Sequence, residues 1–186
     1  MEKNDLRVIK TKNILYSTLL ELMKEKQFEE IKVSDICSHA LINRSTFYSH
    51  YNDKYELLEE YINTLKDSLI EELSKNKNIN NTKQYYIELI KLFFNHIDEK
   101  RNIYISAMIN NRNSITMDII YDVLNHEVTK RLNDIEFKNK TIPVEIISKF
   151  YLGAVFNVGI EWLKNENKYS KEDLVNYLDK LIPDNL

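Results

Sequence analysis

Glycine, proline and cysteine are scarce in this chain. Its 186 residues include two glycines, two prolines and one cysteine. Glycine and proline mark turns, so their scarcity, together with long periodic apolar stripes and no alternating pattern, predicts an all-α protein. The single cysteine, Cys37, excludes an intramolecular disulfide. It falls on the inward side of an expected helix, which favours a small core residue over a nucleophile or a redox sensor.

Long hydrophobic runs and a strong net charge are also missing. No run approaches the length of a membrane span, and the first residues lack the apolar core of a signal peptide. We therefore expect a cytoplasmic protein without a membrane partner. The net charge of −3 argues against non-specific coating of nucleic acid. The net charge is +1 over residues 1–54 and −4 over residues 55–186. This mild asymmetry is compatible with DNA binding but does not by itself indicate it.

The residue patterns of common enzymes are absent as well. The sequence has no glycine loop that would cradle a phosphate and no nucleophile arrangement that can be recognised from spacing. Three histidines, His39, His96 and His126, lack any Cys or carboxylate cluster at metal-ligand spacing, so we interpret them as surface or core residues. We expect neither an enzyme nor a bound metal or cofactor.

The stretch from Lys32 to Lys54 predicts two short helices, a tight turn and the start of a long helix. Asn43 is a good N-cap for the second helix, which begins at Arg44. Asp53 and Glu56 have the spacing of a reciprocal capping pair at the start of the long helix. The apolar residues of the first helix recur at spacings of three and four: Val33, Ile36, Cys37 and Ala40.

The second helix of this stretch has an aromatic inner side and a small, polar outer side. Phe47 and Tyr51 are four residues apart and share one side, with Ser45, Thr46 and Ser49 opposite them. Such a helix is typical of the second helix of a helix-turn-helix, whose exposed face enters the DNA major groove. The pattern fits equally well a capped helix pair with a polar outer face, as found in many helical bundles.

About nine helices in two bodies are expected from the whole chain. An upstream helix whose stripe includes Leu15, Leu19 and Met23 completes a three-helix head. A long helix from Lys54 to about residue 75 leaves this head and enters a C-terminal bundle. We divide the chain into a DNA-binding domain, residues 1–54, and a ligand-binding and dimerisation domain, residues 55–186. Bundle helices are expected near residues 83–99, 101–110, 115–132 and 143–166, and after Ser170, which should pair with Asp173 as a cap.

The expected helix at residues 143–166 contains both glycines of the chain, Gly153 and Gly159. Each costs about 1 kcal/mol relative to alanine in a helix interior. We infer a close approach of another helix, or space for a ligand. The apolar residues of this helix cover more than one side, which indicates burial against its own body and against a partner. The dimer-interface candidates are Val155, Val158, Gly159 and Trp162.

A set of head residues stands at the spacing of a known family. They are Val33, Asp35, Ile36, Ala40, Asn43, Arg44, Ser45, Thr46, Phe47, Tyr48, His50, Tyr51 and Lys54, with the upstream helix from Thr11 and Phe28. Through these residues the head resembles the TetR family of bacterial transcriptional regulators. The C-terminal body is similar, more weakly, to the subgroup of dihydroxyacetone-kinase-type regulators, through Tyr151 to Tyr177. The family commonly has glycine where this chain has Gln27 and Leu41, so Leu41 must make the turn without glycine's access to positive φ.

This resemblance implies a homodimer in which each head offers one helix to half of a palindromic operator on double-stranded DNA. Arg44 can pair bidentately with guanine. His50 could instead make a hydrogen bond within the head. The positions that the resemblance places near base edges are Ser34, Arg44, Ser45 and Tyr48. The positions that it places near phosphates are Lys32, Thr46, Ser49, His50 and Lys54.

We therefore predict a ligand-responsive transcriptional regulator, and a repressor in preference to an activator. A small molecule in the C-terminal body would change the separation of the heads. Aromatic stripes at helical spacing are usually core, so the same residues also fit plain core packing. The alternative is a coregulator whose C-terminal body binds a protein partner. The candidate ligand-binding residues are Tyr86, Phe93, Phe94, Tyr104, Met108, Met117, Tyr121, Phe150 and Tyr151.

Overall fold

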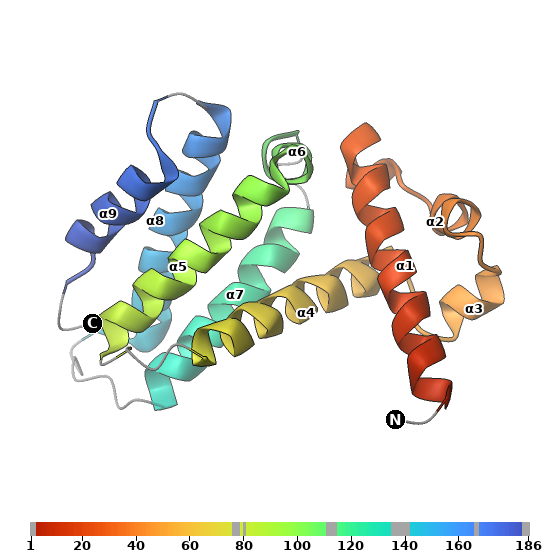
Figure 1. Ribbon diagram of the computed structural model, residues 1–186, viewed down its shortest axis with the longest axis horizontal. Coiled ribbons are helices and arrows are strands. Elements are labelled where there is room, and N and C mark those ends of the chain that lie inside the picture. The colour runs from red at the N-terminus through yellow and green to blue at the C-terminus, as the bar shows by residue number, and fades with distance from the viewer. Residues whose placement is uncertain are drawn as a thin grey trace. The chain divides into compact units, whose positions relative to one another are not determined.

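The computed structural model describes residues 3–75, 79, 81–110, 115–134, 142–165 and 168–183. Over these ranges all regular structure is helical, as predicted, and nine α-helices occur together with one 3-10 and one π segment (Figure 1). The elements are α1 Lys3–Glu25, η1 Phe28–Glu30, α2 Val33–Ala40, α3 Arg44–Tyr48, α4 Lys54–Ser74, α5 Thr82–Glu99, α6 Arg101–Tyr104, η2 Ile105–Asn110, α7 Ile115–Asp134, α8 Val144–Lys164 and α9 Lys171–Leu181.

The chain forms two compact units. Unit 1 comprises residues 1–63 and 102–120, and unit 2 comprises residues 64–101 and 121–186. The continuous helices α4 and α7 therefore contribute residues to both units. The predicted functional boundary after residue 54 is a separate matter and stays a prediction.

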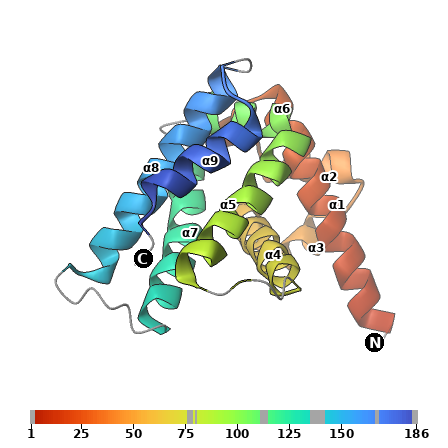
Figure 2. The ribbon, with the colours of Figure 1, turned by 60° about the vertical axis from the view of Figure 1, so that its left-hand side comes forward.

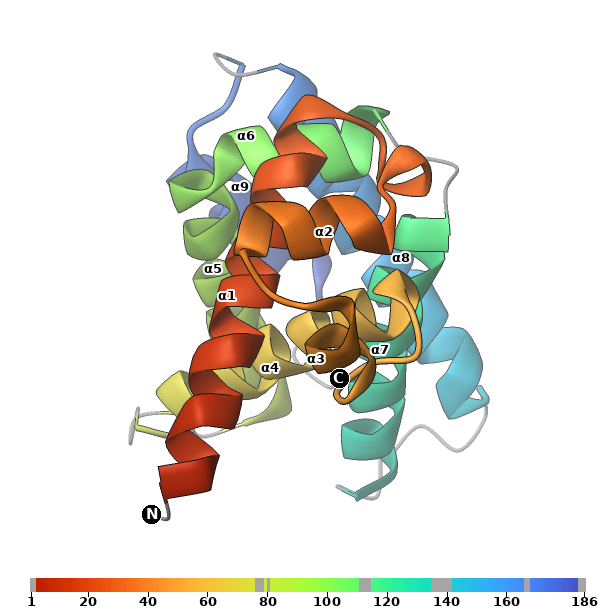
Figure 3. The ribbon, with the colours of Figure 1, turned by 90° about the vertical axis from the view of Figure 1, so that its right-hand side faces the viewer.

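The core of unit 1 is built where the apolar stripe of α1 meets α2 and α3. Leu15, Leu19 and Met23 of α1 are almost fully buried. Figure 3 shows α2 lying across α1, with α3 next to α2. Because α1 begins at Lys3, Thr11 lies inside the helix and donates to the Arg7 carbonyl at 2.9 Å. The helix start expected near Thr11 was therefore placed about two turns too late.

The helix caps in unit 1 lie at the predicted residues, but some of their hydrogen bonds differ from those expected. Asn43 occupies the N-cap of α3, but its side chain makes no cap hydrogen bond. The Asp53 Oδ1 atom accepts from the backbone N–H groups of Tyr55 and Glu56 at 2.8 and 3.0 Å, as a capping residue should. Glu56 accepts from the N–H of Asn52 at 2.7 Å, one residue before the expected donor.

Unit 2 contains α5, α8 and α9 with the adjoining parts of α4 and α7. Helix α9 lies along α5 (Figure 2), and Lys83 pairs with Asp179 across this contact at 3.4 Å. The predicted cap of α9 is confirmed, because the Asp173 N–H donates to Ser170 Oγ at 3.0 Å. Helix α5 begins at Thr82 and α8 at Val144, each one residue from the start expected at residues 83 and 143.

Gly159 and Trp162 of α8 face the interior of unit 2, which contradicts their predicted place in a dimer interface. A Cβ atom added to Gly159 would lie 3.2 Å from Phe94 Cε1. The Phe94 ring also packs edge-on against Trp162, with centroids 5.5 Å apart. The inferred close approach therefore occurs at Gly159, through a ring of α5. At Gly153, apart from the neighbouring residues and the backbone of its own helix turn, no atom of the described residues comes within 4 Å of an added Cβ.

Helix α8 is long and apolar enough to cross a membrane by length and composition alone, contrary to the expectation that no run is. Its 21 residues include an 18-residue window of mean hydropathy 1.2, of which 44% is buried in the protein. Buried residues of α8 include Ile147, Phe156 and Ile160. Core helices pass the same test, so the length of α8 is weak evidence for a membrane segment.

Candidate nucleic-acid interface

The short helix α3 has one buried side and one exposed side. Phe47 has no exposed surface and packs against Tyr51, with ring centroids 5.7 Å apart. Arg44 and Ser45 are exposed, and Tyr48 exposes 55% of its surface. The aromatic residue thus faces inward and the polar residues face outward, as the residue spacing predicts. The outer side could hydrogen-bond to base edges and phosphates.

Leu41 ends α2 in the left-handed region, with φ 55° and ψ 40°. Its N–H donates to the Ser38 carbonyl at 3.4 Å, and the Ile42 N–H donates to the Cys37 carbonyl at 3.0 Å. This is the hydrogen-bond pattern of a Schellman cap, in which glycine is the usual left-handed residue. The expectation that this turn lacks positive φ is therefore wrong. The leucine side chain is 91% exposed, so it adds no packing to offset the backbone strain.

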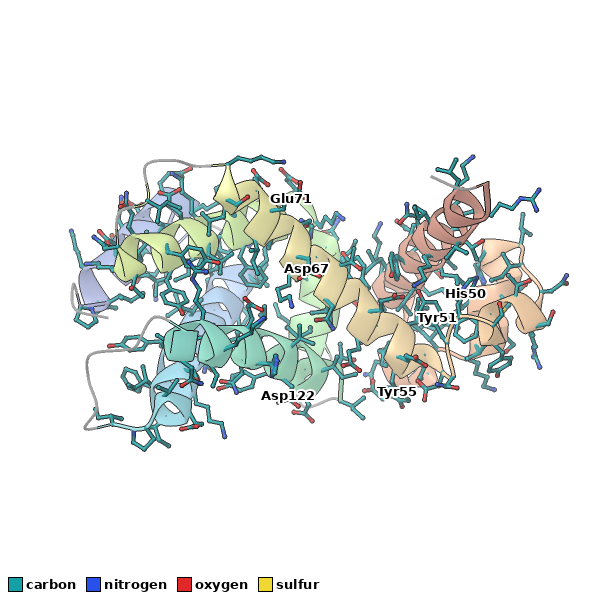
Figure 4. All side chains as sticks on the ribbon, turned by 90° about the horizontal axis from the view of Figure 1, so that it is seen from below. His50, Tyr51, Tyr55, Asp67, Glu71 and Asp122 are labelled. Atoms are coloured by element: carbon teal, nitrogen blue, oxygen red, sulfur yellow. The ribbon has the colours of Figure 1, made fainter. Side chains whose placement is uncertain are left out.

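The residues expected near phosphates differ in accessibility. Lys32 is exposed at the N-cap of α2, while Thr46 is half-buried. Ser49 is exposed and its Oγ donates to the Thr46 carbonyl at 2.7 Å. His50 is half-buried, and its ring lies 6.2 Å from that of Tyr51 between centroids (Figure 4). Ser34, expected near a base edge, is half-buried on α2.

Lys54 is buried, with 8% of its surface exposed. Its Nζ donates to the carbonyl oxygens of Phe28, Glu29 and Ile31 at 2.7, 2.8 and 2.8 Å. Burial lowers the pKa of the ammonium. All three donors are used, so the predicted contact of this side chain with a phosphate is wrong. The ammonium instead ties the segment after α1 to the start of α4.

A hydrogen-bond network that the sequence did not predict joins α1, Tyr51 just after α3, and α4. Glu60 accepts from Lys12 at 2.5 Å, from Tyr16 at 2.9 Å and from Tyr51. Burial would raise the pKa of Glu60, but these hydrogen bonds outweigh it and lower the pKa. Since Tyr51 also packs on Phe47, the network fixes the segment that carries α3. The donors lie up to 48 residues from Glu60 in sequence, so no local pattern indicates them.

Unit 2 contains an apolar cavity of about 110 Å3. Its wall includes three of the predicted ligand-binding residues, Tyr86, Phe93 and Tyr151, and one predicted interface residue, Val155. The remaining lining residues are Lys66, Leu69, Ile70, Leu89, Ile90, Leu124, Glu127, Val128, Leu132, Ile147, Ser148, Leu152, Phe156 and Ile182. The sequence predicted aromatic walls, whereas most of the lining is aliphatic.

The other predicted ligand-binding residues whose side chains are described do not line this cavity. Phe94 packs on Trp162, and the Tyr121 hydroxyl donates to the Lys149 carbonyl at 3.2 Å. Phe150 is 68% exposed on the outer side of α8. Tyr104 and Met117 belong to unit 1, and the side chain of Met108 lies outside the described residues. Aromatic spacing along a helix does not state which neighbour each side meets, so the sequence could not separate these side chains from those in the cavity wall.

Val158 of α8 is half-buried, which leaves its predicted interface role untested. The exposed side of the same helix carries Ile146 and Phe150 one turn apart, followed by Gly153. Among the described residues, no group of three or more His, Cys, Asp or Glu side chains could hold a metal ion.

Known proteins match both ends of the chain. Residues 15–61 match the model of the bacterial regulatory proteins of the tetR family, and residues 87–184 match that of a transcriptional regulator C-terminal region. The HTH-type transcriptional regulator YxbF of Bacillus subtilis is 38% identical over 71 residues, which cover 38% of this chain and 19% of YxbF. The chain thus spans about a fifth of the length of that relative.

Solved structures share the fold across nearly the whole chain. A TetR-family regulator from Syntrophomonas wolfei aligns with a TM-score of 0.71 at 17% identity, covering 92% of each chain. A TetR regulator from Streptococcus agalactiae aligns with a TM-score of 0.66 at 25% identity, covering 96% of each. The dihydroxyacetone kinase operon activator DhaS aligns with a TM-score of 0.61 at 22% identity, covering 93% and 94%, so the subgroup resemblance extends to the fold alone. The C-terminal match covers more than half of the chain, and with the N-terminal match it shows that the chain belongs to the TetR family of bacterial transcriptional regulators.

Proposed function

We propose that this regulator binds a palindromic operator as a homodimer and acts as a repressor in the cytoplasm. The observation that carries the proposal is the exposed side of α3, where Arg44, Ser45 and Tyr48 stand over the buried Phe47. Each α3 enters the major groove of one half-site. Arg44, Ser45, Tyr48 and the half-buried Ser34 face base edges, and Lys32, Thr46, Ser49 and His50 face phosphates.

A charge placed on α3 tests this interface directly. Ser45→Asp adds a carboxylate to an exposed position without removing a buried contact. The variant should lose binding to a pool of random DNA duplexes, because phosphate contacts supply most non-specific affinity. The matched control is Asn176→Asp, the same charge change at an exposed position of α9. Equal affinity of the Ser45 variant and the control would rule out α3 as the DNA-contacting helix.

The dimer forms, in this proposal, through the exposed side of α8 rather than through Gly159 and Trp162. Ile146 and Phe150 expose 57% and 68% of their surfaces there. Gly153, one turn further on, has open space around a Cβ position, so nothing described within this chain accounts for a glycine in the helix interior. A second copy of α8 packing at Gly153 would account for it. Such a contact is self-complementary, as a twofold interface requires.

The cavity of unit 2 is the proposed effector site. It is lined by residues of α4, α5, α7 and α8, and α4 also supplies Leu57 and Leu58 to the core of unit 1. An effector that moves α4 would change the separation of the two α3 helices in the dimer. Adjacent half-sites require about 34 to 36 Å between them, so a small change releases DNA. Residues 1–54 are then the DNA-binding part, and residues 55–186 the ligand-binding and dimerisation part.

A protein partner is the second candidate for the exposed side of α8. The exposed Phe150 favours it, because a large apolar side chain in the open is typical of a protein contact. Sedimentation of the purified chain separates the two possibilities. A dimer that Phe150→Asp dissociates supports the homodimer, whereas a monomeric wild-type chain contradicts it and leaves the surface for an unrelated protein.

A further inference from the structure

Leu41 has an unfavourable backbone conformation. In the described part of the chain it is the only residue other than glycine with a positive φ. Glycine adopts this left-handed conformation freely, whereas the Cβ of a leucine crowds the following carbonyl oxygen. A glycine at position 41 would therefore make the same turn without strain.

The Leu41 side chain gains no packing within the chain that would offset this strain. It is 91% exposed, and the next most exposed large apolar side chain among the described residues, Leu181, is 74% exposed. A single exposed leucine needs no explanation by itself. A leucine that is both exposed and strained does, because residues held in unfavourable conformations cluster at binding sites. A contact with another molecule would account for both properties.

The turn that holds Leu41 leads into the N-terminus of α3. Figure 3 shows this turn on the same face of unit 1 as α2 and α3. Leu41 precedes Arg44, the first residue of α3, by three positions. In a helix-turn-helix the N-terminal residues of the second helix contact base edges in the major groove. With α3 in the groove, Leu41 therefore lies beside the base pairs that the start of α3 contacts.

The segment around this turn has no negative charge. Residues 36–52 include Arg44 but no Asp or Glu, although the whole chain has 29 acidic residues. Asp35, the acidic residue just before this segment, is neutralised by Lys26 Nζ at 2.8 Å. A segment without carboxylates suits a polyanion such as DNA better than a basic protein surface.

The side chain of leucine limits what Leu41 can recognise on DNA. It has no hydrogen-bond donor or acceptor and no charge, so it cannot pair with a phosphate or with the polar atoms of a base. The base edges in the major groove carry one apolar group, the C5-methyl group of thymine. This methyl group is the partner that fits an exposed leucine.

We propose that Leu41 contacts the methyl group of one thymine in each half-site and so contributes to the sequence specificity of DNA binding. This inference rests on the proposed function, and it adds a base-reading residue that lies outside α3. It also accounts for the strain, because a glycine would relieve the backbone but would lose the contact.

Uracil substitution in the operator tests the contact one methyl group at a time. Uracil pairs with adenine as thymine does, but it lacks the C5-methyl group. Each thymine of the duplex selected by the full-length chain is replaced in turn, in both half-sites together. Burial of one methyl group strengthens binding about fourfold, so replacement of the contacted thymine should weaken binding about fifteenfold. A wild-type chain that is indifferent to every replacement would overturn the inference.

Leu41→Ala and Leu41→Gly assign the sensitive thymine to this side chain. In both variants, one thymine that is sensitive in the wild type should become insensitive to uracil. Ser38→Ala changes another exposed side chain near the end of α2 and is the control, which should keep the wild-type pattern. The inference is overturned if both Leu41 variants keep the wild-type pattern, or if Ser38→Ala abolishes the same sensitivity.

The two Leu41 variants also separate a contact from an effect on the shape of the turn. Alanine keeps the strain and shortens the side chain, whereas glycine removes both. Operator affinity should fall to about the same extent in the two variants, although the glycine variant should be more stable than the wild type. Affinity lost in the glycine variant alone would mean that Leu41 acts through the backbone, and would contradict the contact.

The outcomes distinguish this inference from the proposed function. A palindromic operator whose uracil pattern does not depend on Leu41 overturns the inference alone and leaves the leucine for a contact with another protein. A chain that selects no operator contradicts the proposed function and overturns the inference with it.

Discussion

The Lys54 ammonium donates a hydrogen bond of 2.7 Å to the carbonyl oxygen of Phe28, and two further backbone carbonyls accept hydrogen bonds from it. Lys54→Ala leaves these buried acceptors unpaired and should lower the free energy of unfolding by about 2 to 4 kcal/mol. The salt dependence of DNA binding should not change, because the ammonium contacts no phosphate. Denaturant unfolding and a salt titration of DNA affinity measure the two quantities.

Lys32→Ala is the matched control for Lys54. Lys32 is exposed, so its loss should leave stability unchanged and reduce the salt slope by about one counterion. A Lys54 variant of normal stability with a reduced slope would return that residue to the phosphate-contacting set.

Arg44→Ala should weaken binding to the specific operator by about 1 to 3 kcal/mol and relax the preference at one base position. The reason is that Arg44 is exposed at the start of α3, where its guanidinium can reach guanine. Competition with single-base operator variants measures the preference. Equal loss of affinity for every duplex would assign Arg44 to the phosphates instead.

Leu41→Gly should stabilise the protein by about 0.5 to 1 kcal/mol. A left-handed conformation costs a leucine about 1 to 2 kcal/mol, and the extra freedom of glycine in the unfolded chain offsets part of the gain. The leucine side chain is 91% exposed, so its removal loses little packing. Leu41→Ala retains a Cβ and is the control. The strain argument fails if the glycine variant is no more stable than the alanine variant in denaturant titrations.

Glu60→Gln should lower stability by about 1 to 2 kcal/mol near neutral pH, because three donors lose their charged acceptor. The folded pKa of Glu60 is lowered, so its contribution is present above the unfolded pKa of about 4.3 and is lost as pH falls through the folded pKa. The difference between wild type and variant should therefore shrink below about pH 4. A difference that stays constant into acid would mean that the carboxylate charge is not involved.

The two glycines of α8 should respond differently to leucine. Gly159→Leu should destabilise unit 2 by about 1 to 3 kcal/mol, since even a Cβ there lies 3.2 Å from Phe94. Gly153→Leu meets open space within the chain and should leave the fold intact while weakening the dimer. Thermal unfolding and sedimentation equilibrium measure the two effects. A Gly153 variant that dimerises normally would remove this side of α8 from the interface.

Local patterns predicted the elements and the two sides of α3. Phe47 and Tyr51 are one turn apart, and both are buried as that spacing requires. The Ser170 and Asp173 cap was also predicted, because its partners are three residues apart. Lys54 could not be assigned in this way, because its acceptors lie 23 to 26 residues upstream.

Helix α8 shows the same limit in another form. It is apolar on more than one side, so its sequence does not state which side faces the core. Phe150 was assigned inward and Gly159 to a partner, whereas Phe150 is exposed and Gly159 is buried. The orientation depends on neighbours distant in sequence, such as the Phe94 ring of α5 that lies against Gly159.

Selection of bound duplexes from random DNA tests the central claim most directly. If α3 reads DNA in a homodimer, the recovered sequences should contain two inverted half-sites whose centres are about one helical turn apart or a multiple of it. The same selection with Arg44→Ala should recover the palindrome with one base position per half-site relaxed. Recovery of no common sequence, or of a single unrepeated half-site, would contradict the account.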